Sequence, residues 1–439
     1  MGKEFNSKLL ERLKDRCKVA LLKESEPTLE SVLDESARHG VLIGSVDTLF
    51  KKWKLYMQYI ADRIPMLLSL PDEKTTRFKQ FISSISSLLD EAEKETREKL
   101  SKICRAVEGG HAELTTKSTN SFHICSNGNC IYSHGITHPT YSLHLNALSA
   151  NLDFPDVLSE RELEPFQLGW RASDESVIDN RPMMGTTQPW QLIAWLATRF
   201  GNVWVNLHFV NVTSRGITLA VRAIAKDWKQ KLSKEKAIRL SIDFYQRGDY
   251  RPLLTWWLGD GVVDNELHRF QLSIGSKYIQ VVNQAFRGYI DSNRIRLMGK
   301  DAKMLARQLI LSAGSYGILL DVLRSHKWKH LKALANASYK EPVYITIGEF
   351  KMRLLLTNKF LIAVKQFKNK EEAELVVKKL APHAHIYRSK GYIVYVKWSW
   401  LKELMKRDPT LRETIVQYLI KKAETKPQAR KILAKIPLF

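Results

Sequence analysis

The sequence predicts an α+β protein built from several domains. At 439 residues the chain is too long for one hydrophobic core, so we expect roughly two to four domains. Apolar residues recur at helical spacing through the first 110 residues. From residue 111 onward, short alternating strands and turn dipeptides appear, later mixed with helices. We therefore expect a helical N-terminal region followed by domains with antiparallel sheets.

The charge of the chain points to a polyanionic partner. It has 69 Lys and Arg against 46 Asp and Glu, a net charge of +23 and a pI near 9.7. Nucleic acid is the polyanion we expect. A basic ribosome-associated or membrane-surface protein would show the same surplus. The proportions of hydrophobic and charged residues, 44% and 26%, are those of an ordinary globular protein.

Membrane and export signals are not recognisable in the sequence. No apolar run reaches the roughly 18 uncharged residues that a transmembrane helix needs. The first residues, MGKEFNSKLLERLKDRCK, alternate in charge and lack the apolar stretch of a signal peptide. We therefore expect no membrane partner and a cytoplasmic protein, associated with the nucleoid if its source is prokaryotic.

The first half of the chain divides into two predicted domains. Residues 1–110 are expected to form a helical domain that ends at Gly109-Gly110. Residues 111–232 are expected to form an α/β domain with hairpins and no recognisable active site. FHICSNGNCIYSH, with two β-type runs around Asn127-Gly128, is its strongest hairpin pattern.

The same hairpin holds a candidate zinc site. Cys125, Cys130 and His134 could contribute ligands, because Zn²⁺ is bound by converging thiolates and imidazoles. The C-x4-C spacing is looser than the usual C-x2-C, and no second cysteine pair follows. The opposing interpretation, which we prefer, makes Cys125 and Cys130 cross-strand neighbours, either free or disulfide-bonded. Four cysteines in a chain of this length do not predict a disulfide framework.

The stretch LLTWWLGDGVV, residues 253–263, raises the main functional question. Here Asp260 stands between Gly259 and Gly261 at the end of an apolar helix. Asp and Gly commonly end helices, so the carboxylate has a purely structural interpretation. The functional interpretation is that the helix presents a catalytic acid.

A strand with two distinct faces follows this helix. Phe270, Leu272 and Ile274 alternate with a polar set: Arg269, Gln271 and Ser273. Such a polar set offers the donors that recognition of base edges requires. A solvated outer face would show the same alternation.

The order of elements from residue 249 onward resembles the LAGLIDADG homing endonucleases. Residues 253–261 match that nine-residue motif at the first position and at the last two. In the family, two such helices pack together with small residues at the third and seventh positions. Those positions are Thr255 and Gly259, which share one helix face. The resemblance covers about residues 249–407.

This resemblance implies roles for several residues. Asp260 would bind Mg²⁺, which favours carboxylate and water ligands and can activate water for phosphodiester hydrolysis. The basic stretch RSHKWKHLKAL makes Lys327 and Lys329 candidates for stabilising charge on the phosphate. A basic helix end in a chain of this charge also has a non-catalytic explanation.

A second unit is expected after residue 342. Residues 233–342 would form the unit with the G-D-G motif, and residues 343–439 a degenerate copy with the order β-β-α-β-β-α. Its second motif helix would be Leu334–Pro342, with Glu341 as the second catalytic and metal-binding acid. Lys340 and Pro342 depart from the family pattern there. Basic residues on its strands are candidate DNA contacts: Lys351, Arg353, His383, His385 and Lys397.

The expected function follows from the resemblance. The chain would be a DNA-binding protein that hydrolyses or nicks DNA phosphodiesters with Mg²⁺, acting as a monomer with internal pseudo-twofold symmetry. The alternative is a catalytically inactive nucleic-acid-binding protein on the same scaffold, either a DNA-binding factor or an RNA maturase. An unrelated basic nucleic-acid-binding protein, with G-D-G as a turn, is the third interpretation.

Overall fold

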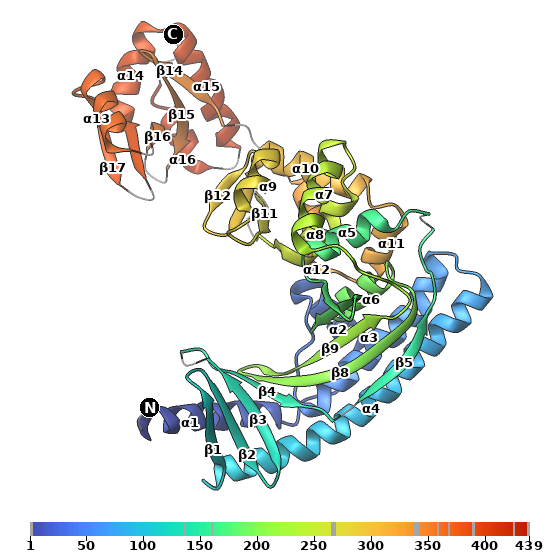
Figure 1. The fold of residues 1–439 in the computed structure, drawn as a ribbon. Helices are drawn as coiled ribbons and strands as arrows, with labels where there is room; N and C mark the ends of the chain where they lie inside the picture. Colours follow the sequence, from blue (N-terminus) through green and yellow to red (C-terminus); the bar gives the residue numbers. More distant parts are fainter. Residues whose placement is uncertain are drawn as a thin grey trace. The chain divides into compact units, whose positions relative to one another are not determined.

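A computed structural model of the chain describes residues 3–135, 137–146, 148–159, 161–264, 269–337, 342–357, 360–367, 369–388, 391–424 and 426–436. The expected α+β class is confirmed, with N-terminal helices and antiparallel sheets interleaved with further helices (Figure 1). The chain divides into two compact units, Met1–Ala337 (unit 1) and Ser338–Phe439 (unit 2). Each unit is described by itself below.

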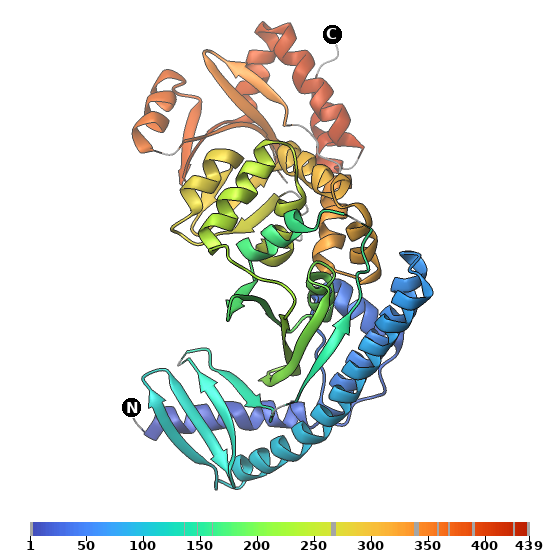
Figure 2. The ribbon, with the colours of Figure 1, turned by 45° about the vertical axis from the view of Figure 1, so that its right-hand side comes forward.

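Unit 1 begins with four helices that contribute many buried apolar residues to its core. The helices are α1 (Lys3–Ala20), α2 (Leu29–His39), α3 (Val46–Leu67) and α4 (Asp72–Glu108). Every fourth or third residue of α4 is apolar and buried, including Phe78, Phe81 and Ile85, as the sequence predicts. The view in Figure 2 shows α1 and α4 on the same side of the curved sheet that follows.

The largest sheet has nine strands in the order β1-β2-β3-β4-β8-β9-β7-β6, and β5 also pairs with β8. Its strands are β1 (Glu113–Ser118), β2 (Ser121–Ser126), β3 (Asn129–His134), β4 (Thr140–His144), β5 (Ser149–Phe154), β6 (Ser176–Ile178), β7 (Arg181–Thr186), β8 (Gly201–Thr213) and β9 (Gly216–Ala225). The 13-residue strand β8 is long enough to pair with β5 through its first half and with β4 through its second. Strand β8 therefore pairs with three strands, β4, β5 and β9.

Unit 1 also contains a second sheet, which has the order β10-β11-β13-β12, and eight further helices. Its strands are β10 (Gly261–Val262), β11 (Arg269–Ser273), β12 (Tyr289–Asp291) and β13 (Arg294–Met298). The helices are α5 (Glu164–Ala172), α6 (Pro189–Leu196), α7 (Lys234–Gln246), α8 (Arg251–Asp260), α9 (Ile279–Phe286), α10 (Gly299–Leu311), α11 (Gly314–Val322) and α12 (His326–Asn336).

Two segments of unit 1 have the same connectivity. The first runs α5-β6-β7-α6-β8-β9-α7, and the second runs α8-β10-β11-α9-β12-β13-α10. In each, the first, second, fourth and third strands lie side by side in that order. The sequence prediction recognised the second of these segments and treated residues 111–232 as a different kind of domain.

Unit 2 contains one five-stranded antiparallel sheet in the order β14-β15-β16-β18-β17. The strands are β14 (Tyr344–Ile347), β15 (Phe350–Leu356), β16 (Leu361–Phe367), β17 (Ala384–Arg388) and β18 (Tyr392–Val396). The helices are α13 (Lys370–Lys379), α14 (Trp398–Arg407), α15 (Pro409–Ala423) and α16 (Pro427–Leu433). The predicted order β-β-α-β-β-α is confirmed in β15 to α14, and its core contains Met352, Leu354 and Val394.

Candidate active site

The candidate site lies where α5 and α8 end side by side in unit 1. The two helices approach so closely that neither contact position has room for a larger residue. A Cβ on Gly169 of α5 would lie 1.9 Å from the Pro252 carbonyl oxygen. A Cβ on Gly259 of α8 would lie 2.3 Å from the Ser173 hydroxyl oxygen. Small residues are therefore a steric requirement at this helix pair.

A hydrogen bond also joins the two helices. The Thr255 hydroxyl of α8 donates to the Phe166 carbonyl of α5 at 2.7 Å. Thr255 is fully buried, so this polar group needs its partner. The expectation that Thr255 and Gly259 face a partner helix therefore agrees with the packing, but the partner is α5.

Two carboxylates mark the ends of these helices. Asp260 is the last residue of α8, and Asp174 follows α5 by two residues. Burial, with the nearby charge of Asp174 as a second cause, raises the pKa of Asp260 to about 6. The positive charges of Lys234 and Lys327 act in the opposite direction. The site is thus a pair of acids whose mutual repulsion is offset by two cations.

Each lysine binds the end of one helix. The Lys234 ammonium donates to the Ser173 carbonyl at 2.8 Å, and the Lys327 ammonium donates to the Gly259 carbonyl. Both lysines lie near the start of a helix, α7 and α12, whose N-cap serine accepts a backbone hydrogen bond. Each helix end of the site therefore has a lysine that donates to a backbone carbonyl and that lies next to or near an N-cap serine.

Lys327 is the deeper of the two cations. Only 8% of it is exposed, and burial lowers its pKa to about 8 although Asp174 and Asp260 favour the charged form. Lys329, two residues further along α12, is exposed and lines a pocket with residues of α2. Lys327 therefore joins the carboxylate pair, whereas Lys329 does not.

A polar network positions the end of α5. The Gln191 amide nitrogen donates to Asp174 Oδ2 at 2.6 Å. The Thr186 hydroxyl in turn donates to the amide oxygen of Gln191. The neighbouring Glu175 is fully buried and accepts two hydrogen bonds from Arg199, at 3.0 and 3.1 Å. Glu175 also accepts from Trp195 and Gln230. This satisfied ion pair fixes the backbone beside Asp174.

The donor set of this site suits a divalent cation of the magnesium type. Mg²⁺ is usually held by one or two carboxylates and retains several water ligands. Asp174 and Asp260 supply two such carboxylates at adjacent helix ends. Within the described ranges, no group of three His, Cys, Asp or Glu side chains forms a more complete metal site.

The second acid expected from the sequence is Glu341. Glu341 lies outside the described residues, as do Ser338 to Lys340. Leu334 to Asn336 form the end of α12 and are not a helix packed beside α8. In the described structure, the partner carboxylate of Asp260 is Asp174.

The predicted base-reading strand keeps its apolar face, but Gln271, which was expected on an open polar face, is buried. On β11, Phe270 and Leu272 are in the core, whereas Arg269 and Ser273 are partly exposed. Gln271 is only 5% exposed, and Arg269 forms an ion pair with Asp264 at 3.7 Å. The cross-strand register adds two basic residues to this face that the sequence prediction did not include: Arg294 and Arg296.

The basic residues predicted in unit 2 occupy different places. Lys351 and Arg353 are exposed on one face of β15, and His385 lies on β17 beside Tyr395, with ring centroids 5.5 Å apart. Lys397 is the N-cap residue of α14. His383 precedes β17 and stacks on Trp400, with centroids 4.7 Å apart, so it is not a strand-face residue.

The four cysteines form two disulfides, Cys17–Cys104 and Cys125–Cys130. Cys125 and Cys130 are direct cross-strand partners in β2 and β3, which is the interpretation preferred over zinc ligation. The expectation that the cysteines form no disulfide framework is wrong, because the packing of α1 against α4 also joins two distant cysteines. Among the described residues, each helix is too short or too polar to cross a lipid bilayer.

Sequence reasoning missed the half of the site that comes from α5. Asp174, Lys234 and Gln191 were not recognised. One pattern could have identified Asp174: Gly169 and Ser173 are four residues apart, and an acid follows Ser173 directly. The same spacing links Thr255, Gly259 and Asp260.

Comparison with family models, curated proteins and solved structures finds no match to this chain.

Proposed function

We propose that unit 1 is a DNA-binding module of the LAGLIDADG homing endonuclease type whose paired acids, Asp174 and Asp260, act in hydrolysis or nicking of DNA phosphodiesters. The observation that carries this proposal is the packing of α5 against α8 with one acid at the end of each helix. In this proposal the second motif helix is α5, and Leu334–Pro342 has no such role.

The motif positions of the two helices support the proposal. When Asp260 is the eighth motif position, the third and seventh positions are Thr255 and Gly259. When Asp174 is the eighth position, they are Gly169 and Ser173. All four residues lie at the contact between the two helices: a Cβ on Gly169 would lie 2.2 Å from Thr255 Oγ1, and one on Gly259 would lie 2.3 Å from Ser173 Oγ. The repeated connectivity around the two sheets of unit 1 supports the proposal of a pseudo-twofold arrangement within one chain.

The side chains of the site have separable roles. Asp174 and Asp260 would hold the divalent cation, which when bound supplies an activated water and neutralises charge on the leaving oxygen. Lys234 and Lys327 favour the ionised form of Asp260 and hold the helix ends through the Ser173 and Gly259 carbonyls. Gln191 orients the Asp174 carboxylate.

The sheets provide basic groups for the DNA backbone and base edges. On β13, Arg294 lies opposite the partly exposed Ser273 of β11, whereas Arg296 lies opposite the buried Gln271 and forms an ion pair with Asp291. Long donors on a rigid strand pair suit contacts to phosphates and to guanine edges. Duplex DNA is therefore the proposed partner of unit 1.

A nicking assay tests the catalytic part. Supercoiled plasmid is incubated with the full chain and Mg²⁺, and the relaxed form is quantified for wild type, Asp174→Asn and Asp260→Asn. Each substitution should reduce nicking by more than the roughly 10- to 100-fold that loss of an outer-shell metal partner costs. Glu162→Gln, on an exposed carboxylate outside the site, is the control.

One observation favours an inactive binding protein as the second candidate. The buried Lys327 ammonium interacts electrostatically with both acids and so can substitute for a divalent cation. Salt-sensitive duplex binding without any nicking, unchanged in Asp260→Asn, would support this candidate and contradict catalysis.

A further inference from the structure

One face of the unit 2 sheet is not covered by any described element of that unit. Along β15, Met352, Leu354 and Leu356 are buried in the core. The helices α13, α14 and α15 contact the strands of this sheet and share that core. The alternate residues of β15, Lys351 and Arg353 among them, lie on the opposite, open face.

The strand register determines which other residues share the open face. Arg353 pairs with Val364, Val364 with Tyr395, and Tyr395 with His385. One row further, Tyr387 pairs with Ile393. Directly paired residues point to the same side of a sheet. The open face therefore carries tyrosines and aliphatic residues at its centre.

A cavity of about 810 Å³ lies on this face. It is lined by Leu355, Thr357, Phe360, Ile362, Val364, Tyr387, Ile393, Tyr395, Lys397, Trp398, Ser399 and Lys402. Phe360 is 56% exposed and Tyr387 is 61% exposed, which is unusual for large rings on a soluble surface. Four aromatic rings thus border one open, mostly apolar hollow.

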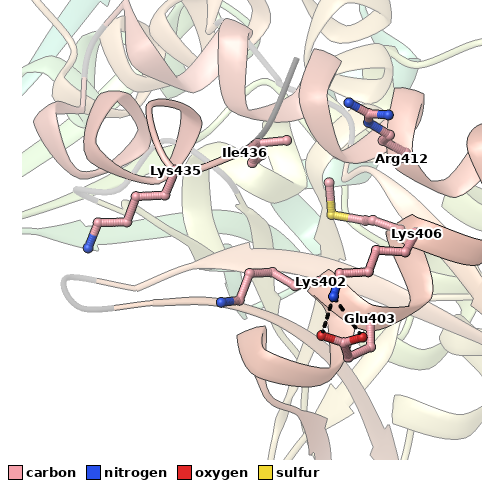
Figure 3. A pocket seen from close by; sticks show the side chains of 7 residues that line it. Lys402, Glu403, Lys406, Arg412, Lys435 and Ile436 are labelled. Atoms are coloured by element: carbon pink, nitrogen blue, oxygen red, sulfur yellow. Dashed lines mark hydrogen bonds and ion pairs between the residues drawn. The ribbon is translucent and has the colours of Figure 1, made fainter. Parts of the chain in front are cut away.

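Two lysines, Lys397 and Lys402, line the hollow, and unit 2 as a whole is strongly basic. Unit 2 contains 22 Lys and Arg against 9 Asp and Glu, so 13 of the 23 net positive charges of the chain belong to its 102 residues. Lys402 lines the hollow and also a second pocket, of about 440 Å³, on the helical side, together with Arg412 and Lys435 (Figure 3). The positive surface therefore continues from the sheet onto the helices.

We propose that this open face, defined by the residues that line the 810 Å³ cavity together with Lys351, Arg353 and His385, binds single-stranded nucleic acid through base stacking. Unpaired bases offer flat apolar surfaces that stack on aromatic side chains, while the phosphates need cations alongside. A duplex conceals those base surfaces and presents phosphates and polar edges, which an apolar hollow does not satisfy. The proposal concerns unit 2 and does not depend on catalysis by Asp174 and Asp260.

The net charge of unit 2 favours single-stranded nucleic acid over a second copy of the chain as the partner of the open face. A second copy of unit 2 would bring a further net charge of +13 against the same basic rim, which is unfavourable. Single-stranded nucleic acid supplies both missing components, flat apolar rings and regularly spaced negative charge. The cation–ring pair of Lys351 over Tyr344, 5.0 Å apart, already places a basic group beside an aromatic one on this face.

The test uses the full chain, with EDTA present to prevent nicking. Fluorescein-labelled (dT)20, (rU)20 and a mixed-sequence DNA duplex are titrated with wild type, Tyr387→Ala and Tyr395→Ala. Each alanine substitution should weaken single-strand binding by about 5- to 100-fold and leave duplex binding within about twofold, since one base stack is lost. Tyr387→Phe keeps the ring and should bind as wild type does.

Matched controls lie on the helical side of the same unit. Leu375 on α13 is 54% exposed, so Leu375→Ala removes a comparable apolar group and should leave single-strand binding unchanged. The ratio of (dT)20 to (rU)20 binding identifies DNA or RNA, and either result supports the proposal. Wild-type single-strand affinity in both tyrosine variants would overturn it, as would a wild-type dimer that Tyr387→Ala dissociates.

Discussion

Gly259 and Ser173 lie in direct contact, at the point where the two helices of the candidate site end. A Cβ on Gly259 would lie 2.3 Å from Oγ and 2.5 Å from Cβ of Ser173. These distances are far below van der Waals contact, so the separation of the two helices depends on the missing side chain. Asp260 and Asp174 each follow one of these two residues, and their proximity is a consequence of the same contact.

Gly259→Ala should therefore destabilise unit 1. The added methyl group forces α5 and α8 apart, and overpacking of this kind costs about 1–3 kcal/mol. Urea denaturation followed by tryptophan fluorescence measures the change. Gly185→Ala is the matched control, because a Cβ on Gly185 of β7 meets nothing within 4 Å. Equal stability of the two variants would contradict the tight helix contact.

The raised pKa of Asp260 predicts a pH-dependent stability. Its folded pKa of about 6 exceeds the ordinary value of 3.8, so the protonated form is favoured in the folded chain. The stability contributed by this group is complete below about pH 3.8 and is lost as the pH rises through about 6. Asp260→Asn should remove that loss, so its advantage over wild type should grow between pH 4 and 7. Denaturation in EDTA at each pH checks this, and a constant difference would argue against it.

Removal of the Lys327 charge should shift the same titration. Lys327 favours ionised Asp260, so Lys327→Met should raise the pKa of Asp260 above about 6. The inflection of the stability–pH curve should then move to higher pH, and nicking near neutral pH should fall. Lys329→Met serves as the control, since Lys329 is exposed on another side of α12. An identical inflection in both variants would exclude Lys327 from the site.

The buried pair of Glu175 and Arg199 should be important for folding. Their side chains are 0% and 3% exposed, and Arg199 donates two hydrogen bonds to the Glu175 carboxylate. Arg199→Met leaves the Glu175 carboxylate buried without its partner, which costs about 3–5 kcal/mol. The exposed pair Arg38–Asp34 is the comparison, and Arg38→Met should leave the denaturation midpoint unchanged. Calorimetry distinguishes the two expectations.

Local sequence patterns were sufficient to predict many of the helices and strands. The helix that ends at Asp260, the two-faced strand with Phe270 and Leu272, and the order of strands and helices in unit 2 were predicted from periodicity and turn residues. Hydrophobic periodicity indicates which face of a helix or strand is buried. It therefore predicts single elements and their order along the chain.

The partner of Asp260 could not be obtained in that way. Asp174 and Asp260 are separated by 86 positions, and only the packing of α5 on α8 brings them together. The sequence suggested Glu341 because it follows the recognised motif along the chain, but proximity in sequence does not determine which helices pack. The pairing of Cys17 with Cys104 was missed for the same reason.

By itself, then, the sequence determined the fold class, the basic character of the chain and the acid at the end of α8, because composition and spacing are local properties. Tertiary structure alone decided which carboxylate faces Asp260, which of Lys327 and Lys329 reaches it, and which residues share the open face of unit 2. Each of those outcomes depends on contacts between distant segments, and the shape of two packed surfaces is not encoded in the periodicity of either one.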